Sequence, residues 1–348
     1  MFFNTILTLV GFFAAYLLKS NANRLRLKPY LLARFFSLAI VLPSILSAWL
    51  VLAVFLPESL LQQDVFQTAH TSPLHELHLL GDLTAKLEPF LAYLTFVFVA
   101  SAVSFAVIST VRSYFRVENI VKKLEMNAPV PPPEKIDLVE TIAANHQIEV
   151  GLVMSRFPFS FVWGFNRSKL LLSSGLLCLL NEAEIEGVLE HEAAHHYRRD
   201  NLAKLLLNFA CYTSLAFSLS RMILKWRAAE VEMICDEVAT ARTCFPLEIA
   251  DALVKLRRQC LTLEPGFSTK ATSAFVPEDV PSLERRVFRL LTFADAPPNL
   301  SKVLGMSRPR RNDKLILVAV FTITLTGIIV FQPLVIHQLA EALVQFFG

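Results

Sequence analysis

The chain has 348 residues, of which 54% are hydrophobic and 18% are charged, and its mean hydropathy is +0.50. A typical soluble enzyme is excluded by this composition, because the apolar residues gather in discrete blocks. The formal net charge is only +3, and we expect no direct nucleic-acid partner.

Four uncharged blocks are each long enough to cross about 30 Å of hydrocarbon as a helix. We expect transmembrane helices at about residues 1–18, 35–56, 89–111 and 315–336. Pro43 should kink the second helix without ending it. Positive charge follows the first block and does not precede it. We therefore interpret this block as an uncleaved anchor and not as a signal peptide.

Loop charges predict how these helices are oriented. The loop between the first two spans holds five basic residues and no acidic one: Lys19, Arg24, Arg26, Lys28 and Arg34. The loop at 57–88 holds five acidic residues and one lysine, whereas both flanks of the long central region are basic. The positive-inside rule then places the central region in the cytoplasm and both termini outside. The predicted location is the inner (cytoplasmic) membrane.

The chain therefore divides into a membrane domain at 1–126, a cytoplasmic domain at 127–312, and a fourth helix with a short outer tail at 313–348. Residues 148–155 and 169–173 are typical of short strands. The aromatic stretch between them, at 157–164, allows two interpretations. It forms a hairpin of the hydrophobic core, or it forms an edge strand to which an extended peptide substrate adds. The second interpretation makes a substrate site of four consecutive residues, Phe161, Val162, Trp163 and Gly164.

A helix is predicted to begin near residue 181. Asn181 and Glu184 have the spacing of a capping box, in which each side chain accepts a hydrogen bond from the other residue's backbone. Ile185, Val188 and Leu189 follow as an apolar stripe with helical spacing. Any motif starting at residue 191 would therefore lie about two turns inside this helix.

The segment His191-Glu192-Ala193-Ala194-His195 has the pattern HExxH. Residues four apart share a helix face, so both imidazoles can bind one Zn²⁺. Glu192 is one step further round, where it can take a proton from a water that zinc has acidified. The motif predicts a zinc-dependent hydrolase with Glu192 as the general base.

A catalytic zinc site usually has a third protein ligand, and Glu232 and Asp236 are candidates because they share one face of a second helix. One could bind the metal while the other orients a histidine. The apolar block at 205–220 would separate Glu232 from HExxH if it crossed the membrane. We therefore expect this block to be buried or re-entrant; otherwise Glu232 is not a ligand.

Two features near these motifs have less direct interpretations. Cys235 stands within the second helix, and we interpret it as a packing residue. The stretch at 282–291 is typical of an amphipathic helix, and its pair Arg285-Arg286 is interpreted as part of a solvated face. Self-cleavage at this dibasic pair is the alternative.

The motifs together resemble the BlaR/MecR family of membrane metallopeptidases. The resemblance rests on the segments at 161–165, 170–176, 184–195, 198–200 and 232–236, the last with that family's ExxCD pattern. The related CAAX prenyl protease and HtpX group usually has alanine where Cys235 stands. Three spans before the protease domain and one after it also look like the receptor family.

This resemblance implies specific roles. His191, His195 and Glu232 would bind Zn²⁺, and Asp236 would orient a zinc histidine. The implied fold is α+β but mostly α: a multi-pass helical membrane protein with a cytoplasmic gluzincin-like zinc metalloprotease domain. Only about a dozen residues follow residue 336, where the best-known family members carry a penicillin-binding sensor. We therefore expect no direct beta-lactam sensing.

The leading hypothesis is a membrane zinc endopeptidase in signal-responsive regulation. Its expected partners are membrane lipid and a protein substrate, for which a transcriptional repressor and the protease itself are candidates. A homodimer is a candidate assembly. The alternatives are constitutive quality control of membrane proteins, as in the HtpX group, and a non-catalytic transducer with structural zinc. Glu192 argues against the transducer, since a structural site needs no general base.

Overall fold

The computed structural model describes residues 2–55, 129–262 and 280–303, except 23, 26, 165–167, 213, 215, 297 and 302, together with isolated positions between 101 and 112. The loop at 57–88 and the predicted fourth helix at 313–348 lie outside the described residues. So does most of the predicted span at 89–111. The proposed domain boundaries at 126 and 313 also stay predictions.

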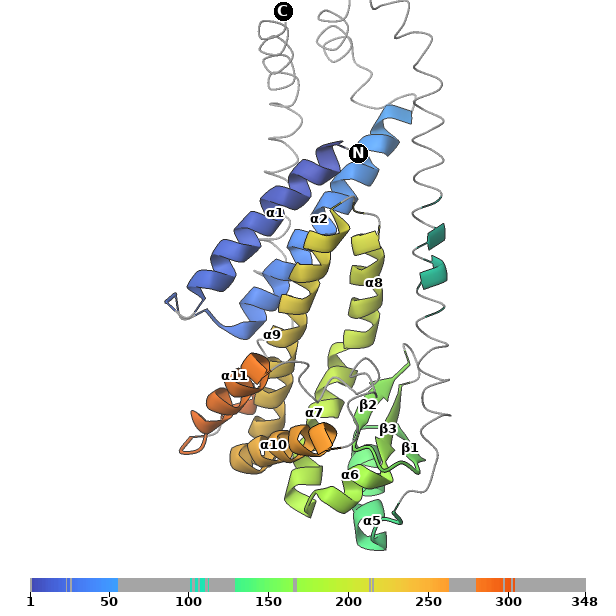
Figure 1. The fold of residues 1–348 in the computed structure, drawn as a ribbon, viewed down its shortest axis with the longest axis vertical. Coiled ribbons are helices and arrows are strands. Elements are labelled where there is room, and N and C mark those ends of the chain that lie inside the picture. Colours follow the sequence, from blue (N-terminus) through green and yellow to red (C-terminus); the bar gives the residue numbers. More distant parts are fainter. Residues whose placement is uncertain are drawn as a thin grey trace, which may run out of the picture.

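Two long helices, α1 (Phe2–Asn21) and α2 (Pro29–Phe55), pack side by side in the upper part of the molecule (Figure 1). Helix α2 begins six residues before the span expected at 35–56, because Pro29 is well suited to a first helical turn and Arg34 does not interrupt it. Pro43 lies inside the continuous helix. Within the described ranges, one helix is long and apolar enough to cross a membrane, at Pro29–Leu46.

A helical hairpin, α8 (Asp200–Tyr212) and α9 (Phe217–Thr243), packs against this pair. Its tip reaches the middle of both helices, where Ser214 Oγ lies 3.3 Å from Thr8 Oγ1 and Ser44 Oγ donates to the Ala210 carbonyl. The chain thus turns back inside the apolar block at 205–220. The part of the block that lies in α8, residues 205–212, rises only about 12 Å as a helix. This is too short to span the hydrocarbon. Glu232 therefore returns to the side of HExxH.

The lower part contains a small mixed sheet of three strands in the order β1-β3-β2. Strand β1 (Glu149–Val153) runs parallel to β3 (Lys169–Ser173), and β2 (Ser160–Trp163) runs antiparallel to it. The pairing of Val162 with Leu170 fixes the register. All three strands fall within stretches expected to be extended, and β2 lies at an edge of the sheet.

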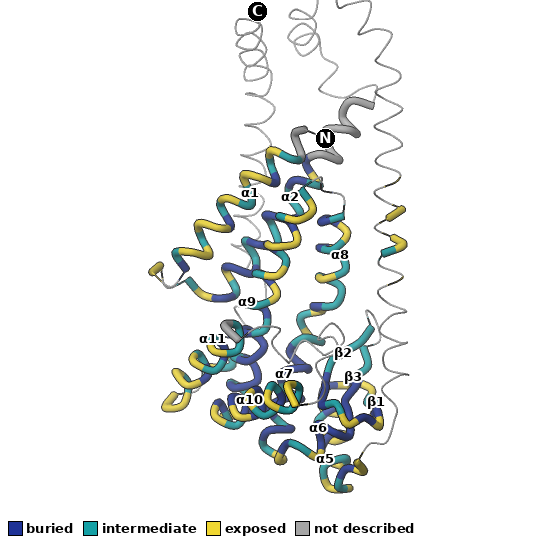
Figure 2. The backbone as a smooth tube through the Cα atoms, viewed as in Figure 1, coloured by how far each residue is buried: buried dark blue, intermediate teal, exposed yellow. Residues whose placement is uncertain are grey.

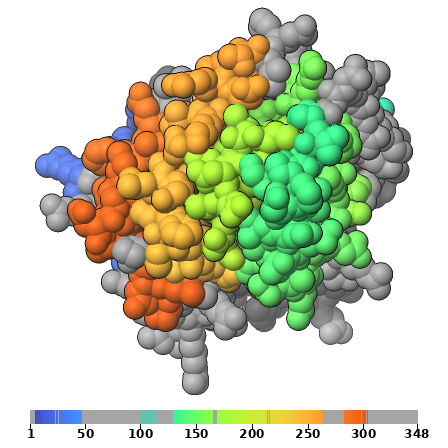
Figure 3. Space-filling view, turned by 90° about the horizontal axis from the view of Figure 1, so that it is seen from below, coloured from blue at the N-terminus to red at the C-terminus, as the bar shows by residue number. Residues whose placement is uncertain are grey.

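Helices surround this sheet and form the main core. They are α5 (Pro133–Asn145), α6 (Ser174–Leu179), α7 (Glu182–Arg198), α10 (Pro246–Thr262) and α11 (Val280–Leu291). Seen from below, the green region on one side of α7 is formed by α5 and the sheet, and the orange region on its other side is formed by α10 (Figure 3). The core residues include Val139, Leu172, Ile185, Val188, Leu189, Ile249, Leu253 and Leu290. Figure 2 shows burial concentrated here. The prediction of a mostly helical α+β chain is confirmed.

Candidate active site

The helix that carries HExxH begins as the sequence predicts. The Asn181 side chain accepts a hydrogen bond from the Glu184 N–H, and the Glu184 carboxylate accepts one from the Asn181 N–H, each at 2.9 Å. Ile185, Val188 and Leu189 are buried, which fixes the rotation of α7 against the core. Both motif histidines consequently face helix α9.

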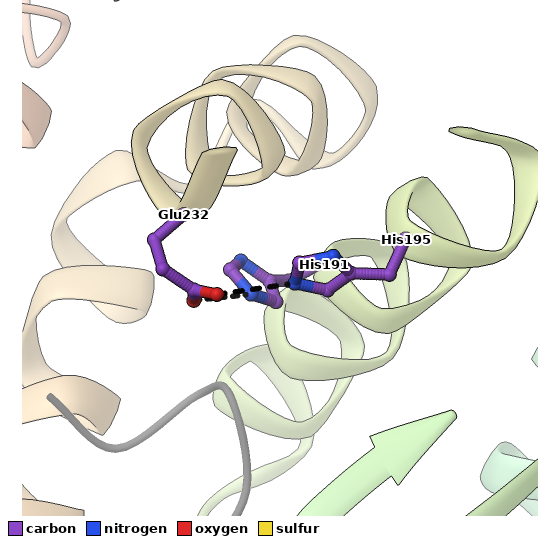
Figure 4. A group of neighbouring side chains, drawn as sticks. All are labelled: His191, His195 and Glu232. Atoms are coloured by element: carbon purple, nitrogen blue, oxygen red, sulfur yellow. Dashed lines mark ion pairs between the residues drawn. The ribbon is translucent and has the colours of Figure 1, made fainter. Parts of the chain in front are cut away.

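His191, His195 and Glu232 converge between α7 and α9 (Figure 4). Glu232 Oε2 lies 3.4 Å from His191 Nε2, and Glu232 Oε1 lies 3.5 Å from His195 Nε2. Tetrahedral Zn²⁺ with bonds of 2.0–2.1 Å would separate its ligand atoms by about 3.3 Å. The buried Nε2 of His195 has no hydrogen-bond partner among the described residues. Donor types and spacing therefore fit zinc.

Each histidine is oriented by a carboxylate at its other ring nitrogen. Asp236 Oδ1 lies 2.9 Å from His191 Nδ1, and Asp200 Oδ2 lies 2.9 Å from His195 Nδ1. Carboxylates in this position commonly fix the tautomer and ring orientation of metal-binding histidines. The pair leaves both Nε2 atoms directed at Glu232. Asp236 thus contacts a motif histidine, and the structure identifies that residue as His191.

Sequence reasoning assigned no role to Asp200. The structure explains its position through Arg199, which ends α7 in the left-handed conformation with φ 54°. This turn starts α8 at Asp200 and brings the carboxylate back to His195. Burial would raise the pKa of Asp200, but the hydrogen bond with His195 and the charge of Arg198 lower that pKa to about 2. A negative side chain is thereby maintained behind His195.

Cys235 is fully buried, with Sγ 3.5 Å from His195 Nδ1. Cys235, His195 and Asp200 together form a second group of side chains that could bind a metal ion. Burial raises the pKa of this thiol, which disfavours the thiolate that zinc would require. The interpretation of Cys235 as a packing residue therefore fits its place behind the imidazole.

The prediction for the dibasic pair at 285–286 is wrong for Arg286. This side chain is only 1% exposed, and two of its nitrogens donate to the two oxygens of Asp236 at 2.7 Å. Its Nη1 also lies 3.3 Å from Glu232 Oε2. Burial alone would raise the pKa of Asp236, but the Arg286 guanidinium holds that pKa well below its ordinary value. Helical periodicity could not show this contact, which joins α11 to α9.

Glu192 lies between the two histidines in sequence and is fully buried. Its Oε2 accepts a hydrogen bond from the Val162 N–H of strand β2 at 3.2 Å. Burial raises the pKa of Glu192, which makes its carboxylate more basic than an exposed glutamate. Asn201 donates to the Val162 carbonyl at 2.7 Å, so both outward polar groups of this edge residue are engaged.

A cavity of about 310 Å³ opens beside His195. Its lining includes Val162 and Gly164 from the edge of the sheet and Tyr197, Arg199 and Asn201 from the end of α7 and the start of α8. Two of the four residues predicted as a substrate strand, Val162 and Gly164, therefore border this cavity. Phe161 and Trp163 belong to β2 but are not part of the lining.

The part of the chain that holds these residues is similar to known peptidases. Residues 117–260 match the model of peptidase family M48. This stretch contains both HExxH and the later ExxCD segment. The chain is also 39% identical over 82 residues to a protease HtpX homolog of Campylobacter curvus, a match that covers 22% of this chain and 23% of the relative.

A second protease HtpX homolog, from Pelotomaculum thermopropionicum, is 30% identical over 125 residues, which cover 33% of this chain and 43% of the relative. The matches thus span less than half the length of either relative. Together with the geometry, they support a metallopeptidase of the M48 type. Peptidases of this type are typically zinc-dependent, in agreement with the donor set described above.

Proposed function

We propose that this protein is a membrane-anchored zinc endopeptidase that cleaves proteins at the cytoplasmic face of the inner membrane. The observation that carries the proposal is the convergence of His191, His195 and Glu232 beside the buried carboxylate of Glu192. When bound by these three side chains, Zn²⁺ would supply Lewis acidity toward a peptide carbonyl and a water.

Glu192 would act as the general base. Its carboxylate takes a proton from the attacking water and later gives that proton to the amine that leaves. The Val162 N–H holds one oxygen of Glu192, so the carboxylate is positioned by the same strand that we propose for substrate binding. Arg286 offsets the negative charge of Glu232 and Asp236, which otherwise would repel each other in a buried site.

The proposed substrate site is the outer edge of β2 together with the glycine that follows this strand, from Phe161 to Gly164. An extended peptide can add to a sheet edge through backbone hydrogen bonds. At Val162, a substrate strand would replace the hydrogen bond from Asn201 with one of its own. The edge lies directly beside Glu192, which supports cleavage of a peptide bound there in an extended conformation.

Apolar side chains on the upper helices support a membrane location. Helix α1 exposes a row of large apolar residues, namely Ile6, Leu9, Val10, Phe13 and Leu17. We propose that α1 and α2 cross the bilayer and that the hairpin tip enters its cytoplasmic leaflet. Lys225 of α9 is charged, and we place it at the surface of the bilayer. Glu232 follows Lys225 by seven residues, or about 10 Å of helix, on the side away from the hairpin tip. The site would therefore face membrane-proximal segments of its substrates.

Two biological roles agree with this chemistry. The ExxCD segment supports a signal-responsive protease of the BlaR/MecR type, with a repressor or the protease itself as substrate. The likeness to HtpX homologs favours the second candidate, constitutive quality control of membrane proteins. Cysteine at position 235 leads us to prefer the first role.

The substrate can be found by comparing the proteomes of cells that express wild-type or Glu192→Gln protein. A signal-responsive protease should leave one or a few proteins uncut in the variant, and only after a stimulus. A quality-control protease should leave many membrane proteins intact without any stimulus. Identical proteomes in both strains under all stimuli would contradict the proteolytic function.

A further inference from the structure

A buried polar contact connects helix α2 to the back of the metal-binding residues. Arg227, on α9, is only 8% exposed, and its Nε donates to Ser37 Oγ of α2 at 2.8 Å. The Ser37 hydroxyl itself donates to the Ala33 carbonyl, also at 2.8 Å. Ser37 is thereby oriented as an acceptor for Arg227.

The other end of Arg227 points toward the site. Its Nη2 lies 3.9 Å from Asp200 Oδ1, and the second oxygen of Asp200 is the one that contacts His195 Nδ1. Arg198 also binds Asp200, at 3.0 Å, but it belongs to the same turn of chain. From α9, the Cys235 thiol also donates to Asp200, at 4.0 Å, but Cys235 makes no polar contact with α2 among the described residues. Arg227 therefore relates Asp200 to α2 by a polar contact. A buried guanidinium needs such partners, since an unpaired buried charge is costly.

Apolar side chains also connect α2 to the helices that carry the site. Ala33 of α2 belongs to one buried cluster with Ala194, Ile234 and Cys235. Ala194 adjoins His195 in sequence, and Cys235 adjoins Asp236. Helix α2 thus packs directly behind residues that hold both proposed zinc histidines. Close-packed contacts of this kind respond to displacements of less than the width of a methyl group.

We propose that Arg227 is a positioning residue that links His195, through Asp200, to Ser37 on α2, so that zinc affinity depends on the position of α2. The link rests on the proposed function in that His195 must be a zinc ligand. A shift of α2 by about 1 Å would stretch the Arg227–Ser37 hydrogen bond beyond its useful range. Arg227 would then lose the partner that holds it near Asp200, and Asp200 would lose one of the contacts that orient it.

The test measures zinc affinity of the full-length protein in detergent by competition with a chromophoric chelator. Loss of a residue that orients a ligand typically costs 10–100-fold in metal affinity, and we expect about 10-fold for Arg227→Gln. Ser37→Ala, one contact further away, should cost about 3–10-fold by the same reasoning. Ser37→Thr retains the hydroxyl and should bind zinc like the wild type.

Ser44→Ala is the matched control, because Ser44 is also on α2 but donates to the Ala210 carbonyl, away from the site. Its zinc affinity should equal that of the wild type. The double variant Ser37→Ala with Arg227→Gln should bind no more weakly than Arg227→Gln alone, because residues that act through one another are not additive. The apo forms of the two serine variants should unfold at similar temperatures.

Equal zinc affinity for Ser37→Ala and Ser44→Ala would overturn the link. Additive losses in the double variant would also overturn it, because Ser37 would then act independently of Arg227. A wild-type protein that binds no zinc would overturn the proposed function as well. Zinc binding and proteolysis that are unaffected by Ser37→Ala would leave the proposed function in place and refute the link alone.

Discussion

Arg286→Met is the substitution that probes the buried charges of the site most sharply. Methionine keeps the apolar part of the side chain but removes both hydrogen bonds to Asp236. Removing one partner of a buried ion pair costs roughly 3–5 kcal/mol, because the other charge is left uncompensated. At roughly 2–4 °C per kcal/mol, the unfolding midpoint should fall by about 6–20 °C.

The measurement is thermal unfolding of the metal-free protein in detergent. Arg258→Met, at an exposed position on α10, is the control and should change stability by about 0.5 kcal/mol or less. Adding Asp236→Asn to Arg286→Met should recover part of the loss, since the buried charge is then removed. If Arg286→Met unfolded like Arg258→Met, the buried pair would not have the importance that we assign to it.

The effect of Arg286→Met on stability should also depend on pH, in a direction that the pKa of Asp236 determines. In the wild type the pKa of Asp236 is lowered in the folded state, so its contribution to stability is present above the unfolded pKa. That contribution is lost as the pH falls toward the folded value. Without Arg286, burial should raise the pKa of Asp236 above the unfolded value. The variant should then regain stability relative to wild type as the pH is lowered.

Three further predictions test the ligand geometry, the packing of α7 and the topology. Asp200→Asn should weaken zinc binding about 10–100-fold without abolishing it, and unchanged affinity in a chelator competition would contradict its role at His195. Gly187→Ala should destabilise the fold by about 1–3 kcal/mol, since the new Cβ would lie 2.6 Å from Ile249 Cγ1; unfolding at the wild-type temperature would refute this close approach. An impermeant thiol reagent added outside the cell should label a cysteine introduced at Gly348 but not one at Ala183, and outer labelling at Ala183 would overturn the orientation.

The sequence predicted the parts of the site that depend on local spacing. HExxH and its capping box specify a helix with both imidazoles on one face, and the spacing of Glu232 and Asp236 specifies another. The return of the chain within 205–220 could be inferred because one metal cannot be bound from both sides of a bilayer. These inferences need only helical periodicity and the length of a membrane span.

Apart from Asp236, the residues that support the ligands could not be found in this way. Asp200 reaches His195 only because Arg199 adopts a left-handed conformation, which is uncommon for arginine. Arg286 reaches Asp236 across 50 residues, from a helix whose charged residues resemble a solvated face. Arg227 and Ser37 are 190 residues apart. A contact between distant elements is determined by tertiary packing, which the periodicity of one segment does not show.

The proposed function depends above all on Glu192 acting as the general base of a zinc-dependent protease. The most direct measurement compares cleavage of a fluorogenic casein substrate by zinc-loaded wild-type and Glu192→Gln proteins, with zinc content and unfolding temperature measured on the same samples. We expect the variant to bind zinc and to fold normally while turnover falls about 10²–10⁴-fold or more. Full activity of Glu192→Gln in the presence of bound zinc would show that Glu192 is not the general base.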